Sequence, residues 1–209
     1  MVTQFDELFR VLDLCGVFVN AALGGVLARS QRFDFVGFVV IALASGLGGG
    51  MLRDTLLQHG TPVGLTDYAY ILTALAGAVS AFMLGFTGRY WHRFYLLMDA
   101  AALGLWATTG AQKTLAAGLG WLPALLLGTI TAIGGGMIRD LLLLRTPRVF
   151  GGNTLYATSA VAASAVLVVL VYAGFSALGA VLAPVVGAGL CLVASWRGWM
   201  LPQAAPKDS

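Results

Sequence analysis

Two copies of one seven-residue motif hold the charged residues of this chain that could bind or pass ions. The first copy, GGGMLRD, occupies residues 48–54, and the second, GGGMIRD, occupies residues 134–140. Each copy places an arginine and an aspartate after three glycines, inside or beside an apolar stretch. Charges at membrane depth are costly, and they mark ion or substrate paths or fixed ion pairs. The motif therefore predicts either a polar path for ions or a charged clamp that fixes the helix register.

We expect these charges to pair between helices and not within one motif. Neighbouring residues on a helix project about 100° apart, so the arginine and the aspartate of one motif should not face each other. Two earlier aspartates match the arginines in predicted depth. The predicted ion pairs are Asp13–Arg53 and Asp99–Arg139. Asp54 and Asp140 would then stay free to meet water or cations.

The glycine runs allow two interpretations. Consecutive glycines loosen a helix because they lack a side chain, so the helices could be interrupted there and expose carbonyls to water or a cation. Alternatively, small residues let two helices pack closely. The residues concerned are Gly48, Gly49, Gly50, Gly134, Gly135 and Gly136. Ser45 and Thr131 precede the two runs, and they could line the same path or bond back to their own helices.

The composition is that of an integral membrane protein. Of 209 residues, 59% are hydrophobic and only 10% are charged, whereas soluble domains carry about 25% charged residues. The net charge of +3 needs no nucleic-acid partner, because basic loops on one side of a bilayer explain it. The sequence has no phosphate-binding loop, zinc-peptidase or hydrolase motif. We therefore predict a protein that is not an enzyme and has no cofactor or resident metal.

The apolar stretches predict an all-α fold of seven transmembrane helices. A helix needs about 20 mostly apolar residues to cross the hydrocarbon core. The predicted spans are 9–28, 35–57, 68–87, 94–114, 121–144, 154–174 and 177–197. The tail, 202–209, is predicted to be disordered.

An internal repeat relates the two motifs. At an offset of 86 residues, eight of twelve positions in 46–57 and 132–143 are identical. The same offset aligns Asp13 with Asp99, Gly24 with Gly110 and Tyr70 with Tyr156. We interpret 9–87 and 94–174 as two copies of a three-span unit. Because three is odd, the second copy would be inverted in the membrane, and 177–197 would be an additional helix.

The basic residues predict the orientation. Nine lie on the side that receives the C-terminus, namely Arg29, Arg32, Arg89, Arg93, Arg139, Arg145, Arg148, Arg197 and Lys207. Three lie on the other side, namely Arg10, Arg53 and Lys113. The excess places the C-terminus in the cytoplasm and the N-terminus outside. Some of the cytoplasmic arginines could also contact anionic lipid head groups.

The duplicated GGG-x-x-R-D motif, the seven spans and the three-plus-three arrangement together resemble the prokaryotic branch of the trimeric intracellular cation channel (TRIC) family, over residues 5–198. The resemblance implies a homotrimer in the cell membrane of a prokaryote, with one pore inside each protomer. The pore would run between two glycine-kinked helices and conduct monovalent cations, chiefly potassium. The kinks would be Gly48–Gly50 and Gly134–Gly136, adjoined by the polar residues Arg53, Asp54, Arg139 and Asp140. The chain lacks the Lys-Glu-Val motif of animal members, so the lipid regulation tied to that motif is not expected.

The leading prediction is thus a passive, potassium-permeable channel. Its selectivity should be modest because the sequence has no TVGYG-type filter. The first alternative is a secondary transporter for a small zwitterion such as glycine, because inverted repeats are common in transporters. A structural or lipid-organising membrane protein is the second alternative.

Overall fold

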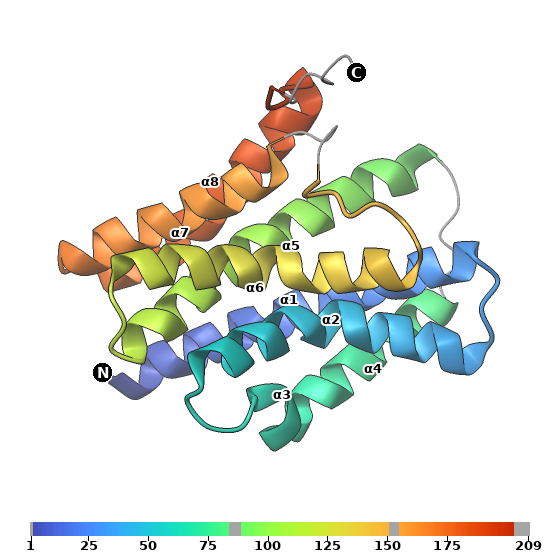
Figure 1. Cartoon of the computed structure of the whole chain (residues 1–209), viewed down its shortest axis with the longest axis horizontal. Helices are drawn as coiled ribbons and strands as arrows, with labels where there is room; N and C mark the ends of the chain where they lie inside the picture. The colour runs from blue at the N-terminus through green and yellow to red at the C-terminus, as the bar shows by residue number, and fades with distance from the viewer. Residues whose placement is uncertain (1, 84–88, 151–154, 203–209) are drawn as a thin grey trace, which may run out of the picture.

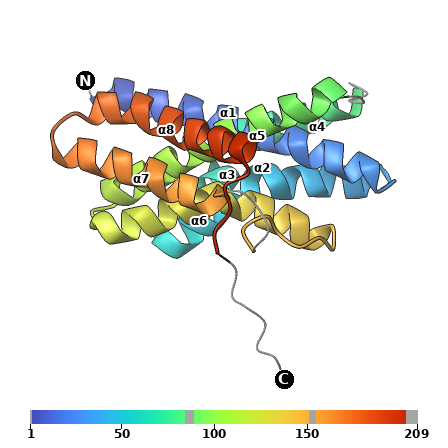
Figure 2. The ribbon, with the colours of Figure 1, turned by 90° about the horizontal axis from the view of Figure 1, so that it is seen from above.

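The computed structural model describes residues 2–83, 89–150 and 155–202. Helices in this part of the chain are α1 (Val2–Ser30), α2 (Phe35–Leu57), α3 (Val63–Thr66), α4 (Tyr68–Met83), α5 (Arg89–Ala116), α6 (Trp121–Leu142), α7 (Tyr156–Tyr172) and α8 (Ser176–Arg197). The long helices run along one common direction, and the connections between them alternate between two ends of the molecule (Figures 1 and 2). This arrangement is a helical bundle whose connections lie at its two ends.

Helix boundaries follow the predicted spans closely. Helix α2 has the predicted bounds, and α8 begins one residue earlier than expected. Helices α1 and α5 extend beyond the predicted spans at both ends because polar turns continue them past the apolar stretch. The short helix α3 was not predicted. The predicted tail, from residue 203 onward, and parts of two predicted spans (84–87 and 154) lie outside the described residues.

Local signals in the sequence account for the ends of α2 and α8. Asp34 precedes α2 and accepts a 2.7 Å hydrogen bond from the backbone N–H of Gly37, as a helix-capping aspartate does. Helix α8 ends at Gly198, whose φ of 66° is left-handed. Glycine adopts that conformation without steric cost, so it is the usual residue beyond a helix C-terminus.

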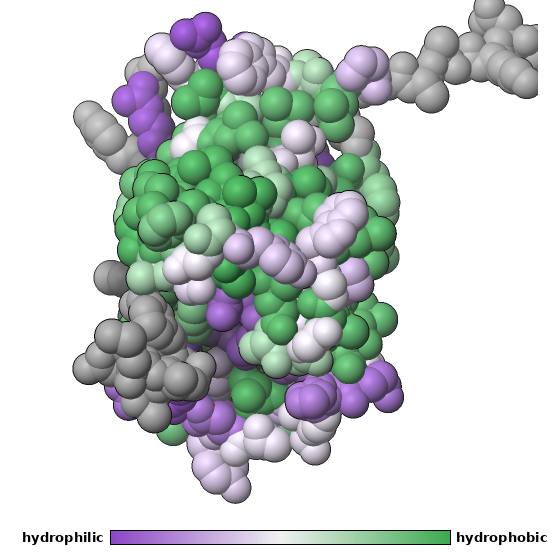
Figure 3. Space-filling model, turned by 90° about the vertical axis from the view of Figure 1, so that its left-hand side faces the viewer, coloured by the Kyte–Doolittle hydropathy of each residue, from purple (hydrophilic) through white to green (hydrophobic). Residues whose placement is uncertain are grey.

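The surface is apolar in the manner of a membrane protein. Helices α1 (from Phe9 to Arg29), α2, α6 and α8 are long and apolar enough to cross a bilayer, and α4 and α7 are shorter apolar helices. Large apolar side chains such as Leu72, Leu126 and Val185 are about 60% exposed, which only lipid would solvate without cost. Figure 3 views the left-hand end of the bundle, where hydrophilic surface gathers in a hollow near the middle and toward the lower edge.

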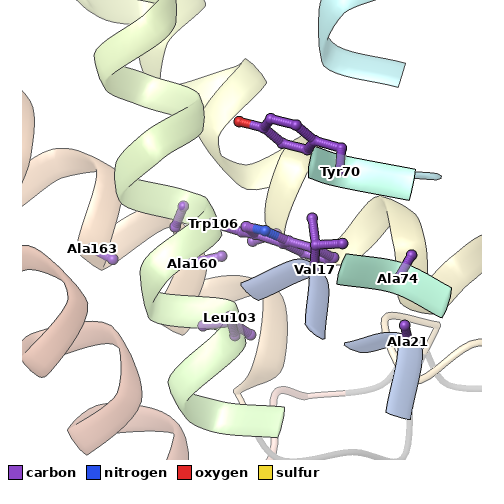
Figure 4. Close-up of a cluster of buried hydrophobic side chains, with 10 residues drawn as sticks. Val17, Ala21, Tyr70, Ala74, Leu103, Trp106, Ala160 and Ala163 are labelled. Atoms are coloured by element: carbon purple, nitrogen blue, oxygen red, sulfur yellow. The ribbon is translucent and has the colours of Figure 1, made fainter. Parts of the chain in front are cut away.

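The core is built mainly from small residues around one large ring. Trp106 of α5 is 1% exposed and lies among Val17, Tyr70 and Leu103 (Figure 4). Alanines from α1, α4, α5, α6 and α7 complete this cluster. Small side chains allow membrane helices to approach closely, which is how such bundles gain packing energy in lipid. The tight packing fixes α2 and α6 against each other near the centre of the bundle.

Candidate functional site

Helices α2 and α6 cross with their backbones in contact at the two glycine runs. A methyl group added at Gly49 would overlap the carbonyl oxygen of Thr131 and lie 3.2 Å from the backbone nitrogen of Gly135. A methyl group at Gly135 would overlap the carbonyl oxygen of Ser45 and lie 3.2 Å from the Trp106 ring. Only glycine fits at these two positions, which are 86 residues apart. We call this contact the glycine crossing.

Both helices run without interruption through their glycine runs. The predicted interruption at Gly48–Gly50 and Gly134–Gly136 is therefore wrong, and the alternative of close packing describes the structure. The physical reason is that a break at membrane depth leaves backbone groups without hydrogen bonds. Each glycine weakens a helix by about 1 kcal/mol relative to alanine, and contact with the opposite helix offsets this.

Ser45 and Thr131 support the glycine crossing. Both are fully buried, and their carbonyl oxygens are the atoms that contact the opposite glycines. The Thr131 hydroxyl donates a 2.5 Å hydrogen bond to the carbonyl of Leu127 in its own helix. The Ser45 hydroxyl has no hydrogen-bond partner among the described residues. Neither residue lines the cavities described next, so their predicted place along a polar path has no support in this geometry.

A small cavity lies on each side of the glycine crossing. The first cavity has a volume of about 10 Å³ and is lined by residues that include Asp13, Gly50, Met51, Arg53, Asp54, Val63, Tyr70 and Trp106. The second cavity has the same volume and is lined by Ile133, Gly136, Met137, Arg139, Asp140, Arg148, Val149 and Tyr156. Each has room for about one water molecule. Seven positions of the two linings correspond at the offset of 86, and of each glycine run only the third glycine lines its cavity.

Arg53 joins two aspartates at the first cavity. Its side chain is 1% exposed, its Nε donates to Asp54 Oδ1 at 2.7 Å, and its Nη1 lies 3.8 Å from Asp13 Oδ2. The predicted pair Asp13–Arg53 is therefore confirmed. The expectation that Arg53 would not face Asp54 is wrong, because the long arginine side chain bends so that Nε reaches the next residue. Asp54 is also not free, since it accepts a 3.0 Å hydrogen bond from the backbone N–H of Val63.

The second cavity repeats part of this pattern. Arg139 is 2% exposed, and its Nε donates to Asp140 Oδ1 at 2.9 Å, so Asp140 is also bound by its neighbour. Asp99 pairs with Arg148, whose Nη1 lies 2.7 Å from Asp99 Oδ2 and whose guanidinium lies over the ring of Tyr95. The ion pairs of the described residues do not include Asp99–Arg139. Arg148 replaces the predicted partner because the loop after α6 returns it to α5.

Lys113 and Tyr70 complete the first cluster, and sequence reasoning did not select either as a site residue. Lys113 Nζ lies 3.0 Å from Asp13 Oδ2, and the Tyr70 hydroxyl donates to the same oxygen at 3.0 Å. Figure 4 shows the Tyr70 hydroxyl turned toward α5, the helix that contains Lys113. For Tyr70, the repeat offset that aligns it with Tyr156 was an available signal. No sequence signal identified the contact between Lys113 and Asp13, which are 100 residues apart.

Each cluster is electrically balanced. The first holds two negative and two positive side chains, namely Asp13, Asp54, Arg53 and Lys113, and the second holds Asp99, Asp140, Arg139 and Arg148. Buried charges are tolerated when they are paired in this way. Nη1 of Arg53 and Nη1 of Arg139 are nevertheless buried without a hydrogen-bond partner among the described residues. An unpaired buried donor costs about 1–3 kcal/mol, so both guanidinium groups have capacity for a further acceptor.

A wider vestibule adjoins the first cavity. Its volume is about 340 Å³, and its lining includes Asp54, His59, Thr61, Val63 and Lys113. It shares Asp54 and Val63 with the first cavity. Within the described residues no group of three or more histidine, cysteine, aspartate or glutamate side chains is placed to hold a metal ion. The chemistry of the site is therefore that of paired charges next to water-sized spaces.

The solved structures that this fold matches include TRIC cation channels. A TRIC orthologue from Rhodobacter sphaeroides is 31% identical, with a TM-score of 0.80 over 91% of this chain and 96% of that one. A second TRIC cation channel structure is 26% identical, with a TM-score of 0.85 over 96% of this chain and 99% of that one. Among curated relatives, a UPF0126 membrane protein of Deinococcus radiodurans is 40% identical over 152 residues, 72% of this chain and 71% of the relative. The UPF0126 inner membrane protein YadS of Escherichia coli K12 is 32% identical over 151 residues, 72% of each protein.

A family model described as glycine transporter matches the chain twice, over residues 10–85 and 96–173. The chain belongs to this family, and it is a prokaryotic member of the TRIC family. This TRIC protein is a multi-pass inner-membrane protein, which explains its exposed apolar side chains. It is not an enzyme, because the TRIC structures that it matches are channels.

Proposed function

We propose that this TRIC protein is a passive channel for monovalent cations, permeable to potassium, with one path inside each protomer between α2 and α6. The observation that supports this proposal is the pair of charge-lined cavities on opposite sides of the glycine crossing. Carboxylates at both cavities would attract cations, and the arginines beside them would keep each cluster neutral.

The proposed topology has seven spans, with the N-terminus outside and the C-terminus in the cytoplasm. Spans 1–3 would be α1, α2 and α4, and the inverted spans 4–6 would be α5, α6 and α7. The double match of one family model, with starts 86 residues apart, supports this repeat. The first cavity would then face the outside, and the second would face the cytoplasm.

In this conformation the proposed path is closed at the glycine crossing. The backbones of α2 and α6 touch there, and this contact would block ions between the two cavities. Conduction would require the two helices to separate near Gly49 and Gly135, which would join the cavities into one hydrated route. Because the sequence has no TVGYG-type filter motif, discrimination between small cations should be modest.

We further propose a homotrimer with lipid between and around the protomers. The similarity to the trimeric intracellular cation channel orthologue of Rhodobacter sphaeroides supports this assembly. An apolar groove of about 380 Å³ on α2, lined by Leu43, Leu47, Met51 and Leu52 among others, is a surface that lipid or a neighbouring protomer could cover.

Recording from purified protein in planar bilayers tests the proposed function. With potassium chloride at unequal concentrations on the two sides, we expect unitary currents that reverse near the potassium equilibrium potential. Bilayers that receive the same detergent without protein are the control. Currents no different from this control, or a reversal near the chloride potential, would contradict the proposal.

A second candidate is a transporter for a small zwitterion such as glycine. The description of the matching family model favours it, and two cavities separated by one closed contact would also suit alternating access. Proteoliposome uptake separates the two functions. Saturable glycine uptake that excess unlabelled glycine inhibits supports transport, whereas potassium flux that stays linear with concentration supports the channel.

A further inference from the structure

We propose that Asp13 and Tyr70 form a binding site for one monovalent cation, and that Lys113 occupies this site with its own ammonium group. The inference deepens the proposed function, since it rests on a cation path past the first cavity for its role. It names a specific position on that path and a competitor within the chain.

The geometry around Asp13 is that of a bound cation. Lys113 Nζ lies 3.0 Å from Asp13 Oδ2, and the Tyr70 hydroxyl donates to the same oxygen at 3.0 Å. The ammonium group also lies 5.9 Å from the centre of the Tyr70 ring, within the range of a cation–π contact. Ammonium and potassium ions have equal charge and similar size. The carboxylate oxygen and the ring face that hold the tethered ammonium are therefore suited to a free potassium ion.

The charges of the cluster select a monovalent ion. With Lys113 in place the two aspartates balance Arg53 and Lys113. Without the lysine charge the cluster has a net charge of −1, and Asp13 is 2% exposed. A buried uncompensated charge is strongly destabilising. One monovalent cation restores neutrality, whereas a divalent cation would leave an excess positive charge.

The site can be reached from outside the bundle. The Lys113 side chain is 29% exposed, and it lines the vestibule of about 340 Å³ together with Asp54 and Thr61. Lysine has a flexible stem, so its ammonium can move into the vestibule and leave Asp13 to a cation entering from there. Binding and release of the lysine would then compete with the ion.

Lys113 is not part of the repeated design. The position 86 residues earlier is Leu27, and the second cluster instead uses Arg148 to pair with Asp99. A planar guanidinium stacked on the Tyr95 ring does not imitate a spherical ion. The tethered ammonium is thus a property of the first cluster.

Thermal unfolding of the purified full-length protein in detergent tests the site. For Lys113→Met we expect the Tm in potassium chloride to exceed that in N-methyl-D-glucamine chloride of equal ionic strength. The expected difference is about 3–6 °C once potassium is about tenfold above its dissociation constant. Lys113→Met combined with Asp13→Asn should lose this difference. As a control, Arg29→Met removes a cation that contacts the Phe82 carbonyl. Its difference in Tm between the two salts should equal that of the wild-type protein.

A second measurement uses the wild-type protein. The chain has two lysines, Lys113 and Lys207, so acylation by an amine reagent can be compared at both by mass spectrometry. Potassium that displaces the ammonium should accelerate acylation of Lys113 relative to Lys207 at least twofold over N-methyl-D-glucamine. Equal ratios in both salts overturn the proposal, and so does a folded Lys113→Met variant without potassium-dependent Tm.

These outcomes are separate from those of the bilayer recording. Wild-type currents together with no potassium effect in either experiment would remove the Asp13 site and leave the channel. A potassium effect without wild-type currents would keep the site and remove the channel.

Discussion

The glycine crossing yields the sharpest prediction, which compares two adjacent glycines of α2. In Gly49→Ala the new methyl group overlaps the carbonyl oxygen of Thr131, an atom that cannot move without its helix. In Gly50→Ala the methyl group lies 3.6 Å from Arg53 Nη2, which is an ordinary contact. The two variants carry the same chemical change at neighbouring positions, so each is the control for the other.

The expected magnitudes follow from these contacts. Overpacking costs about 1–3 kcal/mol, and replacing glycine by alanine in a helix gains up to about 1 kcal/mol. We expect Gly49→Ala to lower the free energy of unfolding by about 2 kcal/mol, and Gly50→Ala to raise it by up to about 1 kcal/mol. The Tm values in detergent should then differ by about 6–12 °C.

The same pair of variants tests the gate in bilayer recordings. Because the methyl group at position 49 fits only when α2 and α6 move apart, Gly49→Ala should increase the open probability relative to Gly50→Ala. Equal Tm values for the two variants would refute the close approach of the helices. A lower Tm with unchanged open probability would refute the crossing as the point of closure.

Two further predictions concern ion pairs. In a double-mutant cycle of unfolding, we expect a coupling free energy of about 0.5–3 kcal/mol between Asp99→Asn and Arg148→Gln. The coupling free energy between Asp99→Asn and Arg139→Gln should be smaller. The reverse order would contradict the observed ion pair of Asp99 with Arg148. Asp67 lies between two spans and accepts a hydrogen bond from Arg10, which lowers the pKa of that carboxyl below its usual value. The stabilisation from this pair is therefore present above the unfolded pKa of about 4, and it is lost as the pH falls through the lower folded pKa. Asp67→Asn should consequently reduce the fall of the Tm at acid pH. A fall of the Tm equal to that of the wild-type protein would count against the pair.

The sequence contained most of the helix arrangement because apolar length and repeat spacing are local or periodic signals. The bounds of α2 could be predicted to the residue from its apolar length, and the structure shows Asp34 as the cap at its start. The short helix α3 could not, because Val63–Thr66 has no periodicity long enough to recognise. Its backbone is held in part by Asp54, nine residues earlier.

Within the candidate site, the predictable part was the set of repeated residues, and the unpredictable part was which atoms touch. Depth matching found Asp13–Arg53 but failed for Asp99, whose partner Arg148 lies in a loop 49 residues away. The glycine runs indicated where α2 and α6 are special, yet they could not distinguish a broken helix from a packed one. That choice depends on whether another backbone lies opposite, which only the tertiary structure determines.

The contact at Gly49 and Gly135 joins main chain to main chain, and this affects how the two halves can move. Interlocked side chains must change rotamer before packed helices can shift. A glycine surface has no side chains that interlock with the opposite helix. Small sliding displacements of α2 along α6 would meet little resistance at this point, as in the shear motions of other proteins. The centre of the bundle thus permits sliding of the two helices, and the charge clusters on either side hold them in one register.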